Sequence, residues 1–62
     1  MTITLTAREC DLAVHALRTQ AELFEDIAAG LDRHQAQDMA QSFRRQAADA
    51  RVLADRIEQA EA

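Results

Sequence analysis

The stretch AELFEDIAAGLDRHQAQDMAQSFRRQA, residues 21–47, holds two apolar heptad series separated by a short polar segment. Apolar residues at alternating intervals of three and four form the a/d pattern of helices that pack side by side. The pattern predicts an all-α fold, an antiparallel helical hairpin. The first series is Ile3, Ala7, Cys10, Val14, Leu17, Ala21, Phe24, Ala28 and Leu31, and the second is Ala36, Ala40, Phe43, Ala47, Ala50, Ala54 and Ile57.

The first helix carries both a start and a stop signal. Thr6 and Glu9 form the capping-box pattern Thr-x-x-Glu, in which each side chain accepts a hydrogen bond from the other residue's backbone amide. Gly30 stands where a helix commonly ends in a left-handed residue. The first helix is therefore predicted over residues 7–29, after a short extended lead-in over residues 1–5.

A second capping box marks the start of the other helix. Asp32 and Gln35 form the pattern Asp-x-x-Gln, which predicts the turn at residues 30–32 and the second helix over about 33–60. Such a short link forces the two helices to lie antiparallel within a single domain, residues 1–62.

A turn centred on residue 32 also predicts the register of the hairpin. In an antiparallel pair, the a positions of one helix lie level with the d positions of the other. Phe24 is then level with Ala40, and Ala21 with Phe43. A large residue meets an alanine in most such layers, an alternation that lets layers interdigitate without voids.

The two flanks of the seam differ in character. On one flank the predicted register places Arg18 opposite Arg44 and Glu25 opposite Gln37, so this flank is charged. The other flank is largely apolar, and a second hairpin packed against it gives a homodimeric four-helix bundle. Scattered surface apolar residues are the alternative, because single ones are common on monomers. The predicted dimer interface is Ala13, Ala16, Gln20, Leu23, Ile27, Met39, Gln46 and Leu53.

Size and composition support association. A chain of 62 residues with one buried stripe usually needs a disulfide, a metal or a partner. A single cysteine excludes an internal disulfide, and no Cys/His spacing fits a structural zinc site. The net charge of −4 disfavours broad binding to nucleic acid or anionic membranes. With no membrane-spanning stretch and no signal-peptide pattern, a cytoplasmic location is expected.

Candidate chemical groups occur only as incomplete sets. Asp11 with His15, and His34 with Asp38, have the i, i+4 spacing of metal ligands, but no third ligand accompanies either pair. Cys10 has no neighbouring His or Asn to complete a nucleophilic pair, and it occupies a core position. We therefore expect no metal, no cofactor and no enzymatic activity.

Charged side chains are the remaining candidates. Glu22, Glu25 and Asp26 form an acidic cluster, which a two-helix hairpin offers no pocket to activate, so a solvated surface is expected there. Basic residues could meet phosphates or an acidic protein, although no aromatic residue is interleaved to stack bases. The candidate partner-binding residues are Arg18, Arg44, Arg45 and Arg51.

The segments Leu23-Phe24-Glu25, Leu31-Asp32 and Gln35-Ala36 resemble the turn region of the Rop family of small RNA-binding hairpins. The resemblance extends to length, short turn and heptad layers, and it implies an antiparallel four-helix bundle. The family holds RNA with lysines, an amide and an aromatic on its first helix, and none of these carries over. The matching region here has no lysine and contains Asp11, His15, Thr19 and Asp26.

The sequence thus predicts a non-enzymatic, cytoplasmic, homodimeric hairpin that binds a macromolecular partner. A protein partner is favoured over RNA by the acidic balance, with a role as adaptor or inhibitor of the kind found in mobile elements. The alternative is an RNA-binding regulator of the Rop type.

Overall fold

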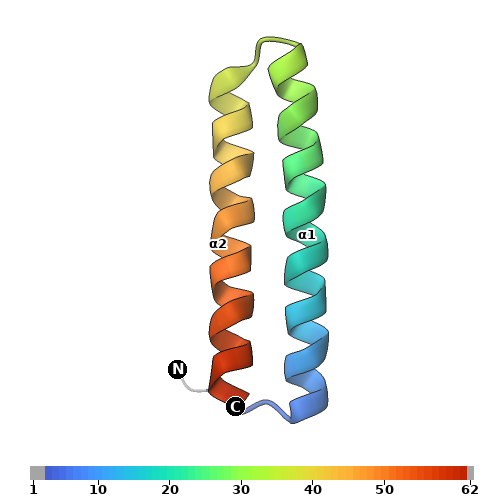
Figure 1. Cartoon of the computed structure of the whole chain (residues 1–62), viewed down its shortest axis with the longest axis vertical. Coiled ribbons are helices and arrows are strands. Elements are labelled where there is room, and N and C mark those ends of the chain that lie inside the picture. Colours follow the sequence, from blue (N-terminus) through green and yellow to red (C-terminus); the bar gives the residue numbers. More distant parts are fainter. Residues whose placement is uncertain (1–2, 62) are drawn as a thin grey trace.

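The computed structural model describes residues 3–61, which form two long helices joined by a tight turn (Figure 1). Helix α1 spans Ala7–Arg33 and helix α2 spans Gln37–Glu61. They lie antiparallel, side by side, in a rod about 42 Å long and 20 Å wide. The described residues include no strand, so the predicted all-α hairpin is confirmed. Neither helix is long and apolar enough to cross a bilayer.

The predicted start of α1 is confirmed by its capping box. The backbone N–H of Thr6 donates to Glu9 Oε1 at 2.8 Å, and the N–H of Glu9 donates to Thr6 Oγ1 at 3.1 Å. The hydrogen bond that the Thr6 amide donates to the Glu9 carboxylate, followed by that from the Thr6 hydroxyl, lowers the pKa of Glu9. Residues 3–6 are not helical, in line with the predicted lead-in, whose first two residues lie outside the described chain.

The end of α1 corrects the sequence prediction. The helix continues through Gly30 to Arg33, and Gly30 does not have a positive φ. The left-handed residue is Gln35, with φ 63°. Its N–H donates to the carbonyl of Asp32 at 3.1 Å, and the N–H of Ala36 donates to the carbonyl of Leu31 at 2.8 Å. This pair of bonds is a Schellman motif, which satisfies the last carbonyls of the helix.

The predicted turn at 30–32 is therefore wrong, and residues 34–36 make the connection. Because Asp32 lies inside α1, it cannot cap the second helix, and α2 begins at Gln37 rather than at residue 33. The first bond of α2 runs from the N–H of Ala40 to the carbonyl of Ala36 at 3.0 Å.

The later turn shifts the register between the helices. The rings of Phe24 and Phe43 pack edge to face with centroids 5.3 Å apart. Two heptads away along each helix, Cys10 and Ile57 line one pocket. Residues at d positions thus face d positions, and the predicted register, which set each phenylalanine level with an alanine, is wrong. The two phenylalanines meet each other, whereas Leu17 and Leu31 come level with Ala50 and Ala36.

This register separates the seam into two layers. In an antiparallel pair the a positions of both helices lie on one side of the contact and the d positions on the other. Every buried apolar residue of the described chain is at an a position, with 0–6% of its surface exposed. We call this set the alanine layer: Val14, Ala21, Ala28, Ala40, Ala47 and Ala54. The d positions form the phenylalanine layer, which is half-buried throughout: Cys10, Leu17, Phe24, Leu31, Ala36, Phe43, Ala50 and Ile57.

Candidate interaction surfaces

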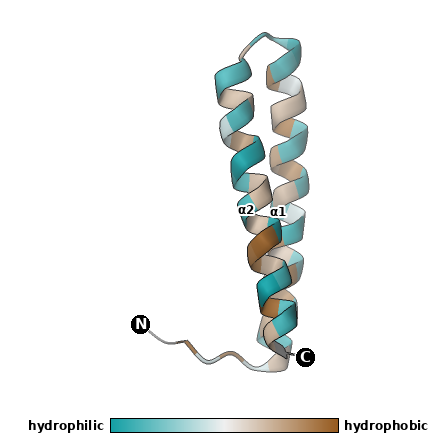
Figure 2. Cartoon of the chain, turned by 60° about the vertical axis from the view of Figure 1, so that its left-hand side comes forward, coloured by the Kyte–Doolittle hydropathy of each residue, from teal (hydrophilic) through white to brown (hydrophobic). Residues whose placement is uncertain are grey.

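The first candidate surface is an apolar face built on the phenylalanine layer. Beside that layer, Ile27, Met39 and Leu53 are 37%, 57% and 45% exposed, and they stand at the adjoining heptad positions. Brown segments recur along both helices in Figure 2, so apolar residues are spread over the length of the hairpin. No large side chain of the described residues is fully buried. A single hairpin therefore buries its small residues and leaves its large ones partly open to water.

The predicted dimer-interface residues flank this apolar face. Ala13 is half-buried, and the other seven are exposed. Sequence reasoning missed the phenylalanine layer as part of this surface, because it assigned both sides of the seam to the core of one hairpin. A signal was available: the a positions hold only alanine and one valine, whereas the d positions hold both phenylalanines.

The second candidate surface is a charged strip of ion pairs that bridge the two helices. Arg18 pairs with Asp55 at 3.1 Å and also with Glu58. Arg44 pairs with Asp32, and Arg51 pairs with Glu25. All these side chains are 38–64% exposed, and most stand at the heptad position beside the alanine layer. The strip consists of Arg18, Glu25, Asp32, Arg44, Arg51, Asp55 and Glu58.

These contacts shift the pKa values of charged groups in the strip. The hydrogen bond from Arg44 lowers the pKa of Asp32, and the same bond raises the pKa of Arg44. The hydrogen bonds that Arg18 donates to Glu58 and then to Asp55 raise the pKa of Arg18. Each shift favours the charged form, so the strip holds complementary charges at neutral pH.

Three of the four candidate partner-binding arginines are thus engaged with carboxylates of the other helix. Arg45 is exposed and makes no ion pair within residues 3–61. Sequence reasoning had set Arg18 opposite Arg44, a repulsive contact. The observed register instead gives each arginine of the strip an acidic neighbour, and this charge complementarity was a signal for the correct register.

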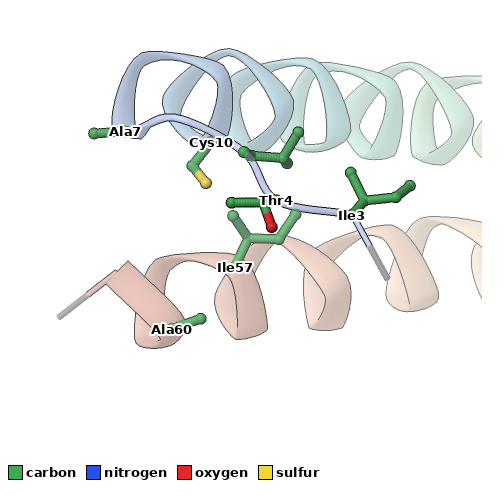
Figure 3. Close-up of a pocket in the computed structure, with 7 residues that line it drawn as sticks. Ile3, Thr4, Ala7, Cys10, Ile57 and Ala60 are labelled. Carbon is green, nitrogen blue, oxygen red and sulfur yellow. The ribbon is translucent and has the colours of Figure 1, made fainter. Parts of the chain in front are cut away.

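A third feature is a pocket of about 540 Å³ at the open end of the hairpin (Figure 3). Residues 3–6 leave the start of α1 sideways (Figure 2). Ile3, Thr4 and Leu5 of this segment form one wall of the pocket. Cys10 and Ile57 of the phenylalanine layer approach each other across the space between the helices. The lining is Ile3, Thr4, Leu5, Ala7, Cys10, Ile57 and Ala60.

The candidate chemical groups are not gathered into a site. Within residues 3–61, no three His, Cys, Asp or Glu side chains come together in a group that could hold a metal ion. No polar or charged residue of this part of the chain is buried. In the predicted acidic cluster of Glu22, Glu25 and Asp26, Glu25 is directed to Arg51.

No protein-family model matches the chain, and no curated protein or solved structure matches it.

Proposed function

We propose that the protein is a non-enzymatic homodimer of helical hairpins, a four-helix bundle that binds another protein as an adaptor or inhibitor. The observation that carries the proposal is the half-buried phenylalanine layer beside exposed Ile27, Met39 and Leu53. Apolar area removed from water stabilises by roughly 25 cal/mol per Å². A second copy presents a matching apolar face, and mutual burial adds the large side chains that the core of one hairpin lacks.

Sedimentation equilibrium at micromolar concentration tests the dimer. The expected mass is twice the chain mass of 6.9 kDa. Ile27→Glu combined with Leu53→Glu places charge on the apolar face and dissociates the dimer. Leu12→Glu combined with Val52→Glu is the matched control, because these residues are 69% and 58% exposed at outward positions. A folded wild-type monomer contradicts the proposal.

A protein partner is favoured because the positive charge of the surface is largely compensated. Binding to a nucleic acid requires several basic side chains to contact phosphates. The net charge is −4, and Arg18, Arg44 and Arg51 already face carboxylates. Exposed ion pairs contribute only about 0–1 kcal/mol, so a partner's carboxylates can replace the internal ones at little cost. The proposed contact residues remain Arg18, Arg44, Arg45 and Arg51.

Partner capture followed by reconstitution with the purified partner tests this surface. Arg44→Gln with Arg51→Gln is expected to raise the Kd at least tenfold while helicity by circular dichroism is kept. Arg8→Gln with Arg33→Gln makes the same change in net charge at arginines that form none of these ion pairs, and leaves the Kd unchanged. Equal effects of the two variants contradict the assignment. Affinity for structured RNA that falls steeply with salt supports the RNA-binding alternative instead.

A further inference from the structure

We infer that the second copy docks on the apolar face with its turn at the open end of the first, and that Gln20 and Gln46 of both copies form the central layer. The inference rests on the proposed homodimer and adds its direction and alignment. Three features of the apolar face carry it: the place of the two glutamines, the sizes of the layers on either side, and the pocket at one end.

The glutamines stand at the middle of the apolar face. Gln20 follows Cys10 by ten residues and precedes Leu31 by eleven. Gln46 follows Ala36 by ten residues and precedes Ile57 by eleven. Both side chains are exposed and occupy the heptad position that flanks the phenylalanine layer. A two-fold axis perpendicular to the helices at this level therefore brings each glutamine close to the same residue of the second copy. It also sets the turn end of one apolar face against the open end of the other.

The carboxamide is suited to such a self-contact. It carries both a donor and an acceptor, so two copies of one side chain can bond to each other. A slip of one helical turn sets the amides against apolar side chains, and an unpaired buried amide costs about 1–3 kcal/mol. One polar position within an apolar seam commonly specifies register in this way. The glutamines thus define the alignment along the helices.

Layer sizes define the direction. With the turns at opposite ends, the layer of Phe24 and Phe43 meets the layer of Leu17 and Ala50 seven residues away. Large side chains are then distributed evenly over the bundle, as close packing requires. With the turns at the same end, all four phenylalanines of the dimer share one layer, and the layer with Ala50 holds only two leucines and two alanines. The opposite orientation fills both layers.

The pocket at the open end receives the partner in this arrangement. Leu31 is half-buried at the turn end and lies as far from the glutamines as Cys10 does on the other side. The two-fold axis therefore carries Leu31 of one copy to the pocket between Cys10, Ile57 and the segment with Leu5 (Figure 3). We assign the partner's Leu31 as the occupant of this pocket.

Distance measurement between spin labels tests the direction. Cys10 is the one cysteine of the sequence and lines the pocket, so Cys10→Ala with Arg8→Cys places a single label outside the pocket, at the exposed start of α1. At a rise of 1.5 Å per residue, opposite turns separate the two labelled positions by about 35 Å along the bundle, whereas adjacent turns leave them level with each other. Cys10→Ala with His34→Cys gives a second label in the exposed turn. Its expected separation is about 40 Å.

The outcomes separate the two proposals. A dimer whose labels lie within about 20 Å at both sites overturns the direction and leaves the homodimer intact. A monomer by sedimentation overturns both. Gln20→Leu with Gln46→Leu tests alignment: the dimer persists, and its distance distribution broadens into several registers. A distribution as narrow as that of the natural chain shows that the amides do not set the alignment and overturns that part of the inference.

Discussion

The ring of Phe24 meets the ring of Phe43 edge to face, with the ring planes inclined at 75°. This contact joins α1 to α2 across the phenylalanine layer and fixes the register of the hairpin. Both rings are only half-buried, so their remaining surface is available to a partner.

Replacing either ring by alanine is expected to destabilise the proposed dimer by about 3–5 kcal/mol, the usual loss for a covered phenylalanine. Because the rings contact each other, the double variant Phe24→Ala, Phe43→Ala loses less than the sum of the single ones. A coupling of about 0.5–1.5 kcal/mol is expected from the aromatic pair. Chemical denaturation of the four proteins of the cycle measures it.

The control for this cycle is Leu12→Ala, since Leu12 is 69% exposed. Its expected effect is within about 0.5 kcal/mol. Additive effects of the two phenylalanine substitutions contradict the observed register.

Ala47→Leu and Ala48→Leu form a matched pair that tests the alanine layer. Ala47 is 1% exposed, whereas Ala48 is exposed. Leucine at position 47 has no room and is expected to lower stability by about 1–3 kcal/mol. Leucine at position 48 changes stability by about 0.5 kcal/mol or less, because helix propensity is similar. Melting temperatures that fall equally for the two variants exclude a close-packed alanine layer.

Gly30→Ala tests the corrected end of α1. Gly30 is helical, and an added Cβ meets only Arg33 Nη2, at 3.9 Å, which is an ordinary contact. Alanine is therefore expected to raise stability by about 0.4–1 kcal/mol. Had Gly30 been the left-handed residue, the same change would lower stability, so the sign in a denaturation experiment distinguishes the two turns.

Gln35→Gly is the complementary substitution in the turn. Gln35 has φ 63°, a conformation in which a side chain is strained and glycine is not. Stability is expected to rise by up to about 1 kcal/mol. His34→Gly is the control, because His34 has φ −100°. If His34→Gly raises stability and Gln35→Gly does not, Gln35 is not the left-handed residue.

Acid is expected to weaken the fold through Glu9 and Asp32. Hydrogen bonds from Thr6 and Arg44, respectively, lower the pKa of these carboxyls in the folded chain. A lowered folded pKa means that the stabilisation is complete above the unfolded value, near pH 4, and is lost as pH falls through the folded value. Glu9→Gln with Asp32→Asn should flatten the dependence of melting temperature on pH between about 5 and 3.

The control for the acid experiment is Glu22→Gln with Asp26→Asn. These carboxylates form no ion pair within residues 3–61. The slope of melting temperature against pH is expected to stay as in the natural chain. A control variant that flattens the slope as much as the test variant would mean that general charge, not the two bonded carboxyls, governs acid sensitivity.

The heptad series and the Thr6 capping box predicted the fold class and the start of α1, because both depend on local spacing alone. The turn was misplaced because Gly30 is the one glycine of the chain and was given the left-handed role. A Schellman motif depends on backbone bonds from Gln35 and Ala36 to carbonyls of α1, and glutamine can supply the conformation at a modest energetic cost.

The error at the turn propagated to the candidate surfaces. A shift of the connection by a few residues changes every facing pair, so the ion pairs of Arg18, Arg44 and Arg51 were not predicted. The heptad pattern also cannot say which side of a seam a second hairpin covers. That information comes from the sizes of the residues at a and d positions, compared along the whole hairpin.

The placement of the ion pairs on one side of the hairpin and the large apolar residues on the other has a consequence for the response to salts. Sodium chloride screens exposed ion pairs, with a Debye length of about 10 Å at 0.1 M, and so weakens the charged strip beside the alanine layer. Sulfate, being excluded from protein surfaces, also strengthens apolar burial and favours any arrangement that covers Phe24 and Phe43. At equal ionic strength, the identity of the anion therefore determines whether the ion pairs or the apolar contacts contribute more to stability.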